Sequence, residues 1–269
     1  MPKLDSLGDV GIFTRDYAKA KRFYTRTIGL KVRSEDRKNG YIALGATKGG
    51  EDASLNLWQP AESWGPEMYE AGRKQIGTVT GVGFSTTDLK RTIEQLKRRG
   101  VKVEMESESS LLARFWDPDG NVLFLQQPSR PKVRRAGLQR LEFVTVVSRD
   151  AAKGGLFFTK ALGMRGKKTQ GTEGEAFTVY RLSPKGTAIM PFAPTREMYD
   201  NPADYDADLA HLGENTSIGF ATRDIQGVQE ALIARGVRFS QKAEKQPWGG
   251  WSARFLDADD NVYSIVQMD

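Results

Sequence analysis

Apolar and polar residues alternate on both sides of a tight turn near the middle of the chain. In the stretch 113–127, ARFWDPDGNVLFLQQ, an alanine and a phenylalanine precede the turn and two leucines follow it at every second position. This alternation is typical of strands that rest one face on a core. Pro118 presets a turn φ angle, and Gly120 permits a positive one. The pattern therefore predicts a β-hairpin.

The same pattern returns at 253–267, ARFLDADDNVYSIVQ, so the chain contains a repeat. Four further segments share a second layout, in which a short apolar strand ends at an aspartate and a helix of about three turns ends at a glycine. Aspartate suits the helix N-cap, and glycine suits the left-handed position after the last turn. The strands are 10–16, 82–88, 144–150 and 218–224, and the glycines are Gly29, Gly100, Gly163 and Gly236. Three more strands follow each glycine, which predicts four modules of strand, helix and three strands.

Longer matches group these modules in pairs. Phe23-Tyr24-Thr25 in the first module returns as Phe157-Phe158-Thr159 in the third, within otherwise similar surroundings. The stretch 128–137 is rich in proline and charge and has no periodicity, which is typical of a linker. We therefore predict one domain over 1–129, a linker over 130–137 and a second domain over 138–269.

Composition narrows the classes of function. The chain has 269 residues, 28% charged and 39% hydrophobic, a net charge of +6 and no cysteine. Disulfides, thiolate metal sites and cysteine catalysis are therefore excluded. We expect a cytoplasmic protein with no secretory signal, no membrane span and no membrane partner. The basic runs 97–99 and 130–135 contain no aromatic residues, so we expect no nucleic-acid partner.

A doubled module of this kind resembles the vicinal oxygen chelate superfamily, which contains glyoxalases, bleomycin-resistance proteins and extradiol dioxygenases. The matching residues are Asp16 before Phe23-Tyr24, and the turn 117–121, DPDGN. The stretch 246–250, QPWGG, is similar to the bleomycin-resistance-like branch. The resemblance implies an α+β fold in which four tandem βαβββ units pair into two open half-barrel domains. It also implies a ligand on the concave face, with a divalent ion there in metal-dependent members.

The family's metal ligands, usually His, Glu or Gln, come from the start of the first strand and the middle of the last strand of its modules. The corresponding positions here are Asp9, Asn56, Gly81, Phe124, Phe143, Met190, Ser217 and Ser264. Only Asp9 and Asn56 offer hard oxygens, whereas a catalytic zinc or iron site needs three protein ligands. The single histidine, His211, lies off these positions, and Glu142 lies one residue out of register, which turns a strand side chain to the opposite face. We therefore expect no metal and no cofactor.

Strand parity predicts which side chains face the concave side. Glycines on that parity (Gly11, Gly81, Gly83 and Gly219) indicate close approach of a ligand or close packing between modules, and both alternatives stay open. Aromatic walls with a few polar groups suit a planar or apolar ligand. Arg114 and Arg254 could each bind a carboxylate or phenolate, or form a cross-strand salt bridge. The candidate ligand-binding residues are Asp9, Phe13, Asn56, Trp58, Arg114, Trp116, Phe124, Gln126, Trp248, Trp251, Arg254 and Ser264.

The leading hypothesis is a metal-free protein of the glyoxalase/bleomycin-resistance type that binds an aromatic or hydrophobic small molecule. One alternative is a metal-dependent lyase, isomerase or extradiol-type dioxygenase with a relocated site, and another is an interaction module whose cleft is filled by its own side chains. The sequence assigns no catalytic residue, so enzymatic activity stays open, with binding favoured. Four modules in one chain make a monomer feasible, and a homodimer is the alternative.

Overall fold

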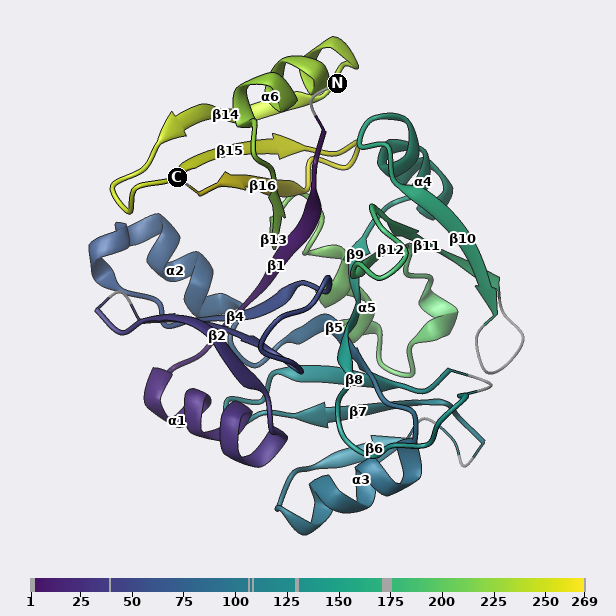
Figure 1. Ribbon diagram of the computed structural model, residues 1–269. Coiled ribbons are helices and arrows are strands. Elements are labelled where there is room, and N and C mark those ends of the chain that lie inside the picture. The colour runs from purple at the N-terminus through teal and green to yellow at the C-terminus, as the bar shows by residue number, and fades with distance from the viewer. Residues whose placement is uncertain are drawn as a thin grey trace. The chain divides into compact units, whose positions relative to one another are not determined.

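The computed structural model describes residues 3–38, 40–105, 107, 109–128, 131–170 and 176–268. Each predicted module is present, which confirms the α+β class (Figure 1). Module 1 contains β1 (Ser6–Phe13), α1 (Tyr17–Arg22), the π-helical turn η1 (Phe23–Ile28), β2 (Lys31–Asp36), β3 (Tyr41–Gly45) and β4 (Ser54–Trp58). Module 2 contains β5 (Val79–Ser85), α3 (Leu89–Arg98), β6 (Val103–Met105), β7 (Leu112–Trp116) and β8 (Val122–Gln126).

The other two modules repeat this order. Module 3 contains β9 (Arg140–Val147), α4 (Ala151–Lys160), β10 (Arg165–Gln170), β11 (Ala176–Arg181) and β12 (Ala188–Phe192). Module 4 contains β13 (Asn215–Ala221), α6 (Ile225–Ala234), β14 (Arg238–Lys245), β15 (Trp251–Leu256) and β16 (Val262–Gln267). Among the described residues, no helix combines the length and hydrophobicity needed to cross a membrane.

The structure confirms the aspartate predicted at the start of each module helix and the glycine predicted at its end. The four aspartates cap their helices, and the carboxylate of Asp16, for example, accepts the backbone N–H of Lys19 at 2.9 Å. The glycines after the helices all have positive φ, from 71° at Gly163 to 97° at Gly29. Each helix therefore begins and ends where residue chemistry satisfies or releases its terminal backbone groups.

The polar connections that follow modules 1 and 3 both contain short helices that the sequence pattern does not predict. The first forms η2 (Glu62–Trp64) and α2 (Pro66–Lys74), and the second forms η3 (Arg196–Met198) and α5 (Pro202–Leu209). A proline occupies the first turn of α2 and of α5, where its missing N–H costs nothing. Short helices with few buried residues leave little periodicity in the sequence.

The paired glycines inside α4 have a packing reason. A Cβ atom on Gly155 would lie 1.9 Å from the Tyr180 hydroxyl, and one on Gly154 would lie 3.1 Å from the Ser148 hydroxyl. The helix thus lies close to β11 and to the end of β9. The propensity cost of about 1 kcal/mol per glycine is offset by this close contact.

The chain divides into two compact units. Among the described residues, the first unit is Asp9–Val144, and the second contains those up to Gly8, those from Thr145 to Gln170 and those from Ala176 onward. In the first unit, β1, β4, β3 and β2 follow one another in one sheet, and β9, β5, β8, β7 and β6 in the other. In the second unit the orders are β1, β13, β16, β15, β14 and β9, β12, β11, β10. Strands β1 and β9 each cross the boundary between the units.

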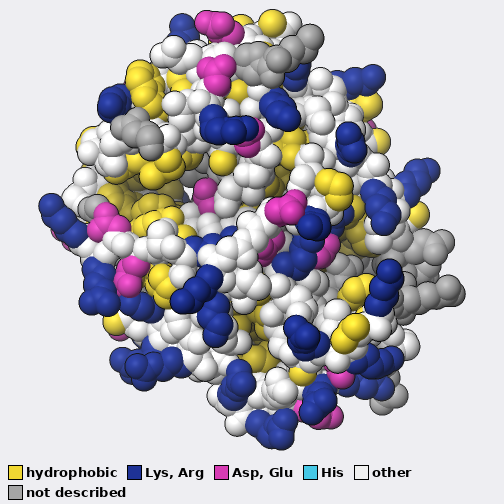
Figure 2. Space-filling view, in the orientation of Figure 1, with side chains coloured by type: hydrophobic (Ala, Val, Ile, Leu, Met, Phe, Trp, Pro, Cys, Tyr) yellow, Lys and Arg dark blue, Asp and Glu magenta, His cyan; other side chains and the backbone are white. Residues whose placement is uncertain are grey.

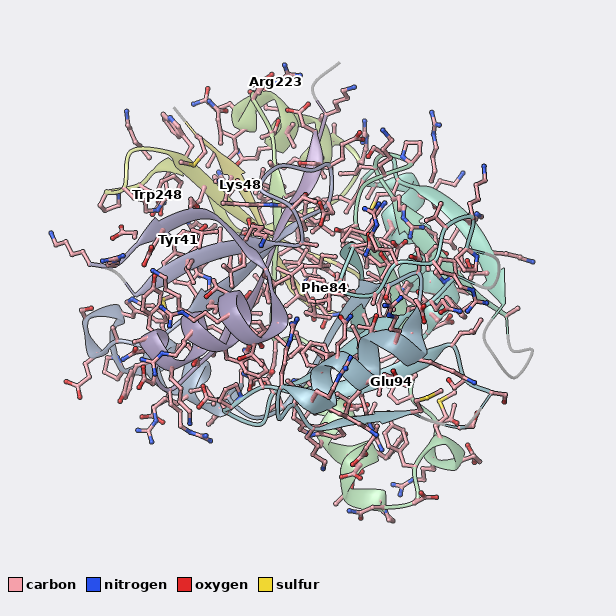
Figure 3. The ribbon with its side chains drawn as sticks, turned by 60° about the horizontal axis from the view of Figure 1, so that its bottom comes forward. Tyr41, Lys48, Phe84, Glu94, Arg223 and Trp248 are labelled. Atoms are coloured by element: carbon pink, nitrogen blue, oxygen red, sulfur yellow. The ribbon has the colours of Figure 1, made fainter. Side chains whose placement is uncertain are left out.

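One face of the hairpin formed by β7 and β8 is fully buried. In the predicted hairpin, Ala113, Phe115, Leu123 and Leu125 have no exposed surface, which confirms the alternation. Phe84 of β5, labelled in Figure 3, also has no exposed surface and joins the same core. The opposite face therefore remains for polar and aromatic side chains. On the surface drawn in Figure 2, basic side chains are scattered, with acidic ones between them.

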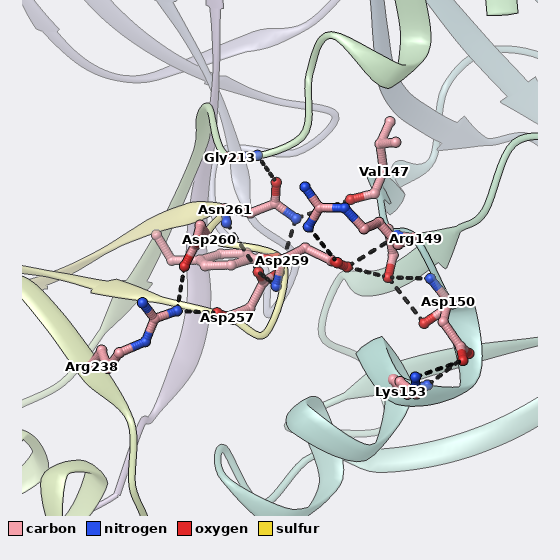
Figure 4. Close-up of polar contacts among 12 residues, drawn as sticks. Val147, Arg149, Asp150, Lys153, Gly213, Arg238, Asp257, Asp259, Asp260 and Asn261 are labelled. Atoms are coloured by element: carbon pink, nitrogen blue, oxygen red, sulfur yellow. Dashed lines mark hydrogen bonds and ion pairs between the residues drawn. The ribbon is translucent and has the colours of Figure 1, made fainter.

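The hairpin turns also tie successive modules together. Asn121 donates to the Phe13 carbonyl at 2.9 Å, and its side-chain oxygen accepts the Gly77 N–H at 2.7 Å. In the second unit, Asn261 donates to the Val147 carbonyl at 2.9 Å and accepts the Gly213 N–H at 2.9 Å (Figure 4). The repeated turn sequence is thus a joint between modules as well as a chain reversal.

The buried carboxylate of each turn receives a tyrosine hydroxyl, but from different positions. Asp117 accepts from Tyr24 of η1 at 3.0 Å, and Asp257 accepts from Tyr263 of β16 at 2.9 Å. In the second unit, where the tyrosine lies on β16 of module 4, Phe158 of module 3 occupies the helix position that Tyr24 holds in module 1. Burial raises the pKa of both carboxyls, while their hydrogen bonds act in the opposite direction.

Candidate ligand-binding site

One face of the module 1 strands gathers four of the predicted site residues. In the parallel pair of β1 and β4, Gly11 lies opposite Asn56 and Phe13 lies opposite Trp58. Asp9 precedes Gly11 by two positions and shares its face. Tyr41 of β3 lies on the other side of Trp58. Together with Trp64 of η2, these side chains form what we call the Asp9 cluster: Asp9, Phe13, Tyr41, Asn56, Trp58 and Trp64.

A polar group occupies one end of the Asp9 cluster. The side-chain oxygen of Asn56 accepts a hydrogen bond from the Ser54 hydroxyl at 2.9 Å. The Asn56 amide nitrogen, its only donor, is therefore directed to its other partners, the Asp9 carboxylate and the Tyr41 hydroxyl. Asn56 is 4% exposed, so its orientation is fixed by buried contacts.

The electrostatics of Asp9 follow from its surroundings. Burial raises the pKa of Asp9 to about 6, and the hydrogen bond from Asn56 opposes that rise. Burial also raises the pKa of Tyr41; hydrogen bonds to Ser34 and Asn56 lower it, while the Asp9 charge adds to the rise. The pair presents a carboxyl that titrates near neutral pH and a phenol that stays protonated there.

Aromatic rings continue from this polar end. The Tyr41 and Trp58 ring centroids lie 4.4 Å apart, those of Trp58 and Trp64 lie 6.0 Å apart, and those of Phe13 and Trp64 lie 6.5 Å apart. The last two pairs meet edge to face, a favourable geometry for aromatic rings. Helix α2 approaches Phe13 at Gly72, where a Cβ atom would lie 3.1 Å from the ring.

Sequence reasoning left Tyr41 and Trp64 out of the site set. Tyr41 stood in a predicted strand, but its partner on the next strand depends on the register, which places it opposite Trp58. Trp64 stood in a connection whose helix was not predicted. The sequence pattern that pointed to Trp64 was the group of tryptophans at strand ends and in connections, to which it belongs, although it was not among the candidate residues.

A second group of predicted residues lies on β7 and β8. Arg114 faces Phe124 across the hairpin and pairs with Glu104 at 3.4 Å, the cross-strand alternative left open by the sequence. The Trp116 ring has the Lys102 ammonium 4.0 Å and the Arg114 guanidinium 5.6 Å from its centroid. Through these cation–π contacts, Trp116 and Arg114 bind each other and Lys102 within module 2.

The residues around Phe124 and Gln126 pack against β5 and β9. Gly83 lies between Phe124 and Phe143, whose ring centroids are 6.5 Å apart. A Cβ atom on Gly83 would lie 2.2 Å from the Phe143 ring. At this glycine, the close approach is made by a neighbouring side chain. Gln126 lies opposite Ser85 in the next row.

Gly83→Ala is expected to lower the free energy of unfolding by about 1–3 kcal/mol, because the buried Phe143 ring must leave its place. Urea denaturation of the variant and the parent protein measures the change. Gly49→Ala is the matched control, since nothing lies within 4 Å of its added Cβ atom. Equal stability of the Gly83 variant and the parent would show that the ring does not occupy this space.

The remaining predicted residues lie in the second unit. Arg254 of β15 faces Ser264 of β16, and the Ser264 hydroxyl donates to the Ile218 carbonyl at 3.3 Å. Trp251 begins β15, opposite Lys245 and Gln267. Trp248 is 50% exposed at the tip of its hairpin, where its ring lies over Gly250. Among these four, Arg254 and Ser264 face each other directly, while Trp248 lies at the end of the hairpin.

The residues at the family's metal positions do not fit a metal centre. Phe124 and Phe143 pack against each other, and Asp9 and Asn56 carry the carboxylate and the amide oxygen at these positions. Over the described ranges, no three His, Cys, Asp or Glu side chains are placed to hold an ion together. The His211 ring nitrogen lies 3.0 Å from the Glu214 carboxylate.

The side-chain direction predicted for Glu142 assumed strict alternation along the strand, and this alternation is interrupted at Glu142. The register of β5 with β9 shifts between Gly83–Phe143 and Phe84–Leu141, so Glu142 is an extra residue in a bulge. A bulge cancels the one-residue argument that turned this side chain away. Its carboxylate pairs with Arg140 at 3.1 Å.

Comparison with known proteins bears on this fold and site. The model of the Glyoxalase/Bleomycin resistance protein/Dioxygenase superfamily matches residues 6–125 and 140–265. The chain belongs to this superfamily. The two matched ranges correspond to modules 1–2 and modules 3–4, so the superfamily pattern occurs twice in this member.

Individual proteins are also similar to this chain in sequence or in fold. The chain is 27% identical over 129 residues to the uncharacterized protein YetH of Bacillus subtilis, covering 46% of this chain and 99% of YetH. Glyoxalase I from Zea mays matches with a TM-score of 0.67 and 17% identity, over 97% of this chain and 92% of that one. A putative dioxygenase from B. subtilis matches with a TM-score of 0.62 and 13% identity, over 99% and 86%. At these identities the two solved structures establish the fold alone.

Proposed function

We propose that this superfamily member binds an aromatic or hydrophobic small molecule at the Asp9 cluster, without a metal ion. The observation that carries the proposal is the continuous row of rings from Tyr41 through Trp58 and Trp64 to Phe13, which ends at the oriented Asn56 and the carboxyl of Asp9. Rings supply area for a planar ligand, and the polar end can fix its orientation.

The polar end favours a ligand with a hydrogen-bond donor or a basic nitrogen. The Asp9 carboxyl is ionised above its pKa of about 6 and then accepts hydrogen bonds only. Asn56 and Tyr41 lie beside it and contribute donors of their own. A ligand that covers Trp58 and donates to Asp9 would replace the water that a partly buried carboxylate otherwise needs.

Titration with a panel of planar aromatic compounds, followed by tryptophan fluorescence and calorimetry, tests the proposal. Trp58→Ala is expected to weaken binding of a positive compound at least about tenfold, since a truncated aromatic contact commonly costs more than 1.4 kcal/mol. Trp248→Ala is the matched control, because Trp248 is half exposed at a hairpin tip.

Thermal unfolding of both variants separates loss of binding from loss of fold. Unchanged affinity in Trp58→Ala, with the fold intact, would contradict the site. Stoichiometric zinc, iron, manganese or nickel in protein purified without chelator would contradict the metal-free part of the proposal. A cytoplasmic location remains a prediction from the sequence.

One observation favours a second function for the same residues. A carboxyl with a pKa of about 6 is close to the range in which a general acid or base works best at neutral pH. Under this alternative, Asp9 would move a proton on the bound molecule. Product formed from a bound panel compound, and detected by mass spectrometry, would favour the enzyme over the binding protein.

A further inference from the structure

A cavity of about 400 Å³ lies in the second unit, where the end of α4 meets α6. Its apolar lining includes Leu162, Val228 and Leu232, each of which is at most 5% exposed. The volume lies in the range of small-molecule pockets. No residue of the Asp9 cluster lines the cavity, so what it binds is a separate question from the proposed function.

Positive charge surrounds this apolar space. Lys3, Arg165 and Arg235 line the cavity, and all three are exposed. Asp5 is the one acidic residue in the lining, and its carboxylate accepts from the Arg223 guanidinium at 3.3 Å. Over the described ranges, no ion pair is recorded for Lys3 or Arg165. The charge next to the cavity is therefore positive.

Comparison between modules separates the packing role of Arg235 from the cavity itself. Arg235 donates to the Ala161 carbonyl at 2.7 Å, and the equivalent Arg99 donates to the Thr27 carbonyl at 2.7 Å. Both bonds satisfy an orphan carbonyl at a helix end. The bond from Arg235 therefore has a structural role that recurs in both units. Lys3 and Arg165 are the lining cations that can contact a ligand.

The sequence of α6 explains the apolar space. Counting from the capping Asp88 and Asp224, Val228 corresponds to Thr92 and Ala231 corresponds to Gln95. The Thr92 hydroxyl accepts the Gly137 N–H at 3.0 Å and lies 2.7 Å from the Thr86 hydroxyl. The second unit replaces this hydrogen-bonding residue with valine, and the long glutamine with alanine. The first change makes this face of α6 apolar, and the second leaves volume against it.

We propose that this cavity binds a small carboxylate with an apolar tail. The tail would lie against Leu162, Val228 and Leu232, and the carboxylate would lie at Arg165 and Lys3. A guanidinium matches the planar, two-oxygen geometry of a carboxylate, and a flexible lysine adds a second donor. The proposal is independent of the Asp9 cluster, and either could fail without the other.

Calorimetric titration with decanoate, decanol and decylamine at low ionic strength tests the head-group preference. The three compounds share a tail and differ in charge. We expect decanoate to bind with a dissociation constant below about 1 mM, and decanol and decylammonium to bind at least about tenfold more weakly. Equal affinity for the three compounds, or no heat with decanoate, would overturn the proposal.

Ala231→Gln tests the location, because it introduces the residue that module 2 carries at Gln95 and thereby fills the cavity with a side chain the fold already accepts. Decanoate affinity should fall at least about tenfold. Ile233→Gln is the matched control, since Ile233 is 47% exposed on the same helix and does not line the cavity. Arg165→Glu should abolish the preference of decanoate over decanol.

Thermal unfolding establishes that each variant is folded before it is titrated. If decanoate binds folded Ala231→Gln as tightly as the parent, it binds elsewhere and the proposed location is wrong. If Trp58→Ala then binds decanoate more weakly than the parent does, decanoate binds at the Asp9 cluster instead. Unchanged preference in folded Arg165→Glu would contradict the role of the arginine.

Discussion

Asn261→Ala is expected to lower the free energy of unfolding by about 3 kcal/mol. The 1% exposed side chain donates to the Val147 carbonyl at 2.9 Å and to the Asp257 carboxylate at 3.0 Å, and it accepts the Gly213 N–H at 2.9 Å. Alanine leaves all three partners without this bond. An unsatisfied buried polar group costs about 1–3 kcal/mol, and partial access of water lowers the sum. Urea denaturation with a constant m-value measures the loss.

The repeat supplies an internal replicate and a control. Asn121→Ala should show a similar loss, because Asn121 bonds to the Phe13 carbonyl, the Asp117 carboxylate and the Gly77 N–H. Asp260→Gly, one residue before Asn261, should change stability by less than about 1 kcal/mol. It loses an exposed ion pair with Arg238, but it gains a residue suited to the φ of 68°. A loss of unfolding free energy under 1 kcal/mol in Asn261→Ala would show that its hydrogen bonds do not hold the modules together.

The turn shows which structural features can be predicted from the sequence and which cannot. Its residues predict the chain reversal, because proline, aspartate and glycine act on their own backbone. The same residues do not reveal that Asn121 and Asn261 bind strand ends 108 and 114 positions earlier. Which distant carbonyl an amide meets depends on the packing of modules, and no local rule contains that information.

The candidate site follows the same division. Parity placed Asp9 and Phe13 on one face, since a period of two needs only the strand and its direction, and Asn56 was found as one of the family's metal positions. Tyr41 required the register of β3, and Trp64 required a helix with no buried stripe. At Glu142 parity failed, because a bulge inserts one residue without any sign in the alternation.

Asp9→Asn is expected to stabilise the protein by about 2 kcal/mol at pH 7.5. The folded pKa of Asp9, about 6, lies above the ordinary value for an aspartate, so folding favours the protonated form. Between about pH 4 and pH 6 the folded chain keeps a proton that the unfolded chain has lost, and stability falls as the pH rises through this window. Above pH 6 the full penalty of the charge persists. A fully buried shift of this size would be worth about 3 kcal/mol, which we reduce because Asp9 is only partly buried.

Asparagine has the shape of the acid without its charge, so the benefit should grow with pH. Urea denaturation at pH 4, 5, 6 and 7.5 should give a difference near zero at the lowest pH and a plateau above pH 6. Glu94→Gln on α3 is the control, since this exposed carboxylate should give a small difference at every pH. A destabilised Asp9→Asn variant at pH 7.5 would mean that the ionised carboxylate is held by favourable contacts in the free protein. A stabilised one would mean that the charge of Asp9 lowers the stability of the free protein, as a carboxylate that still lacks its ligand would.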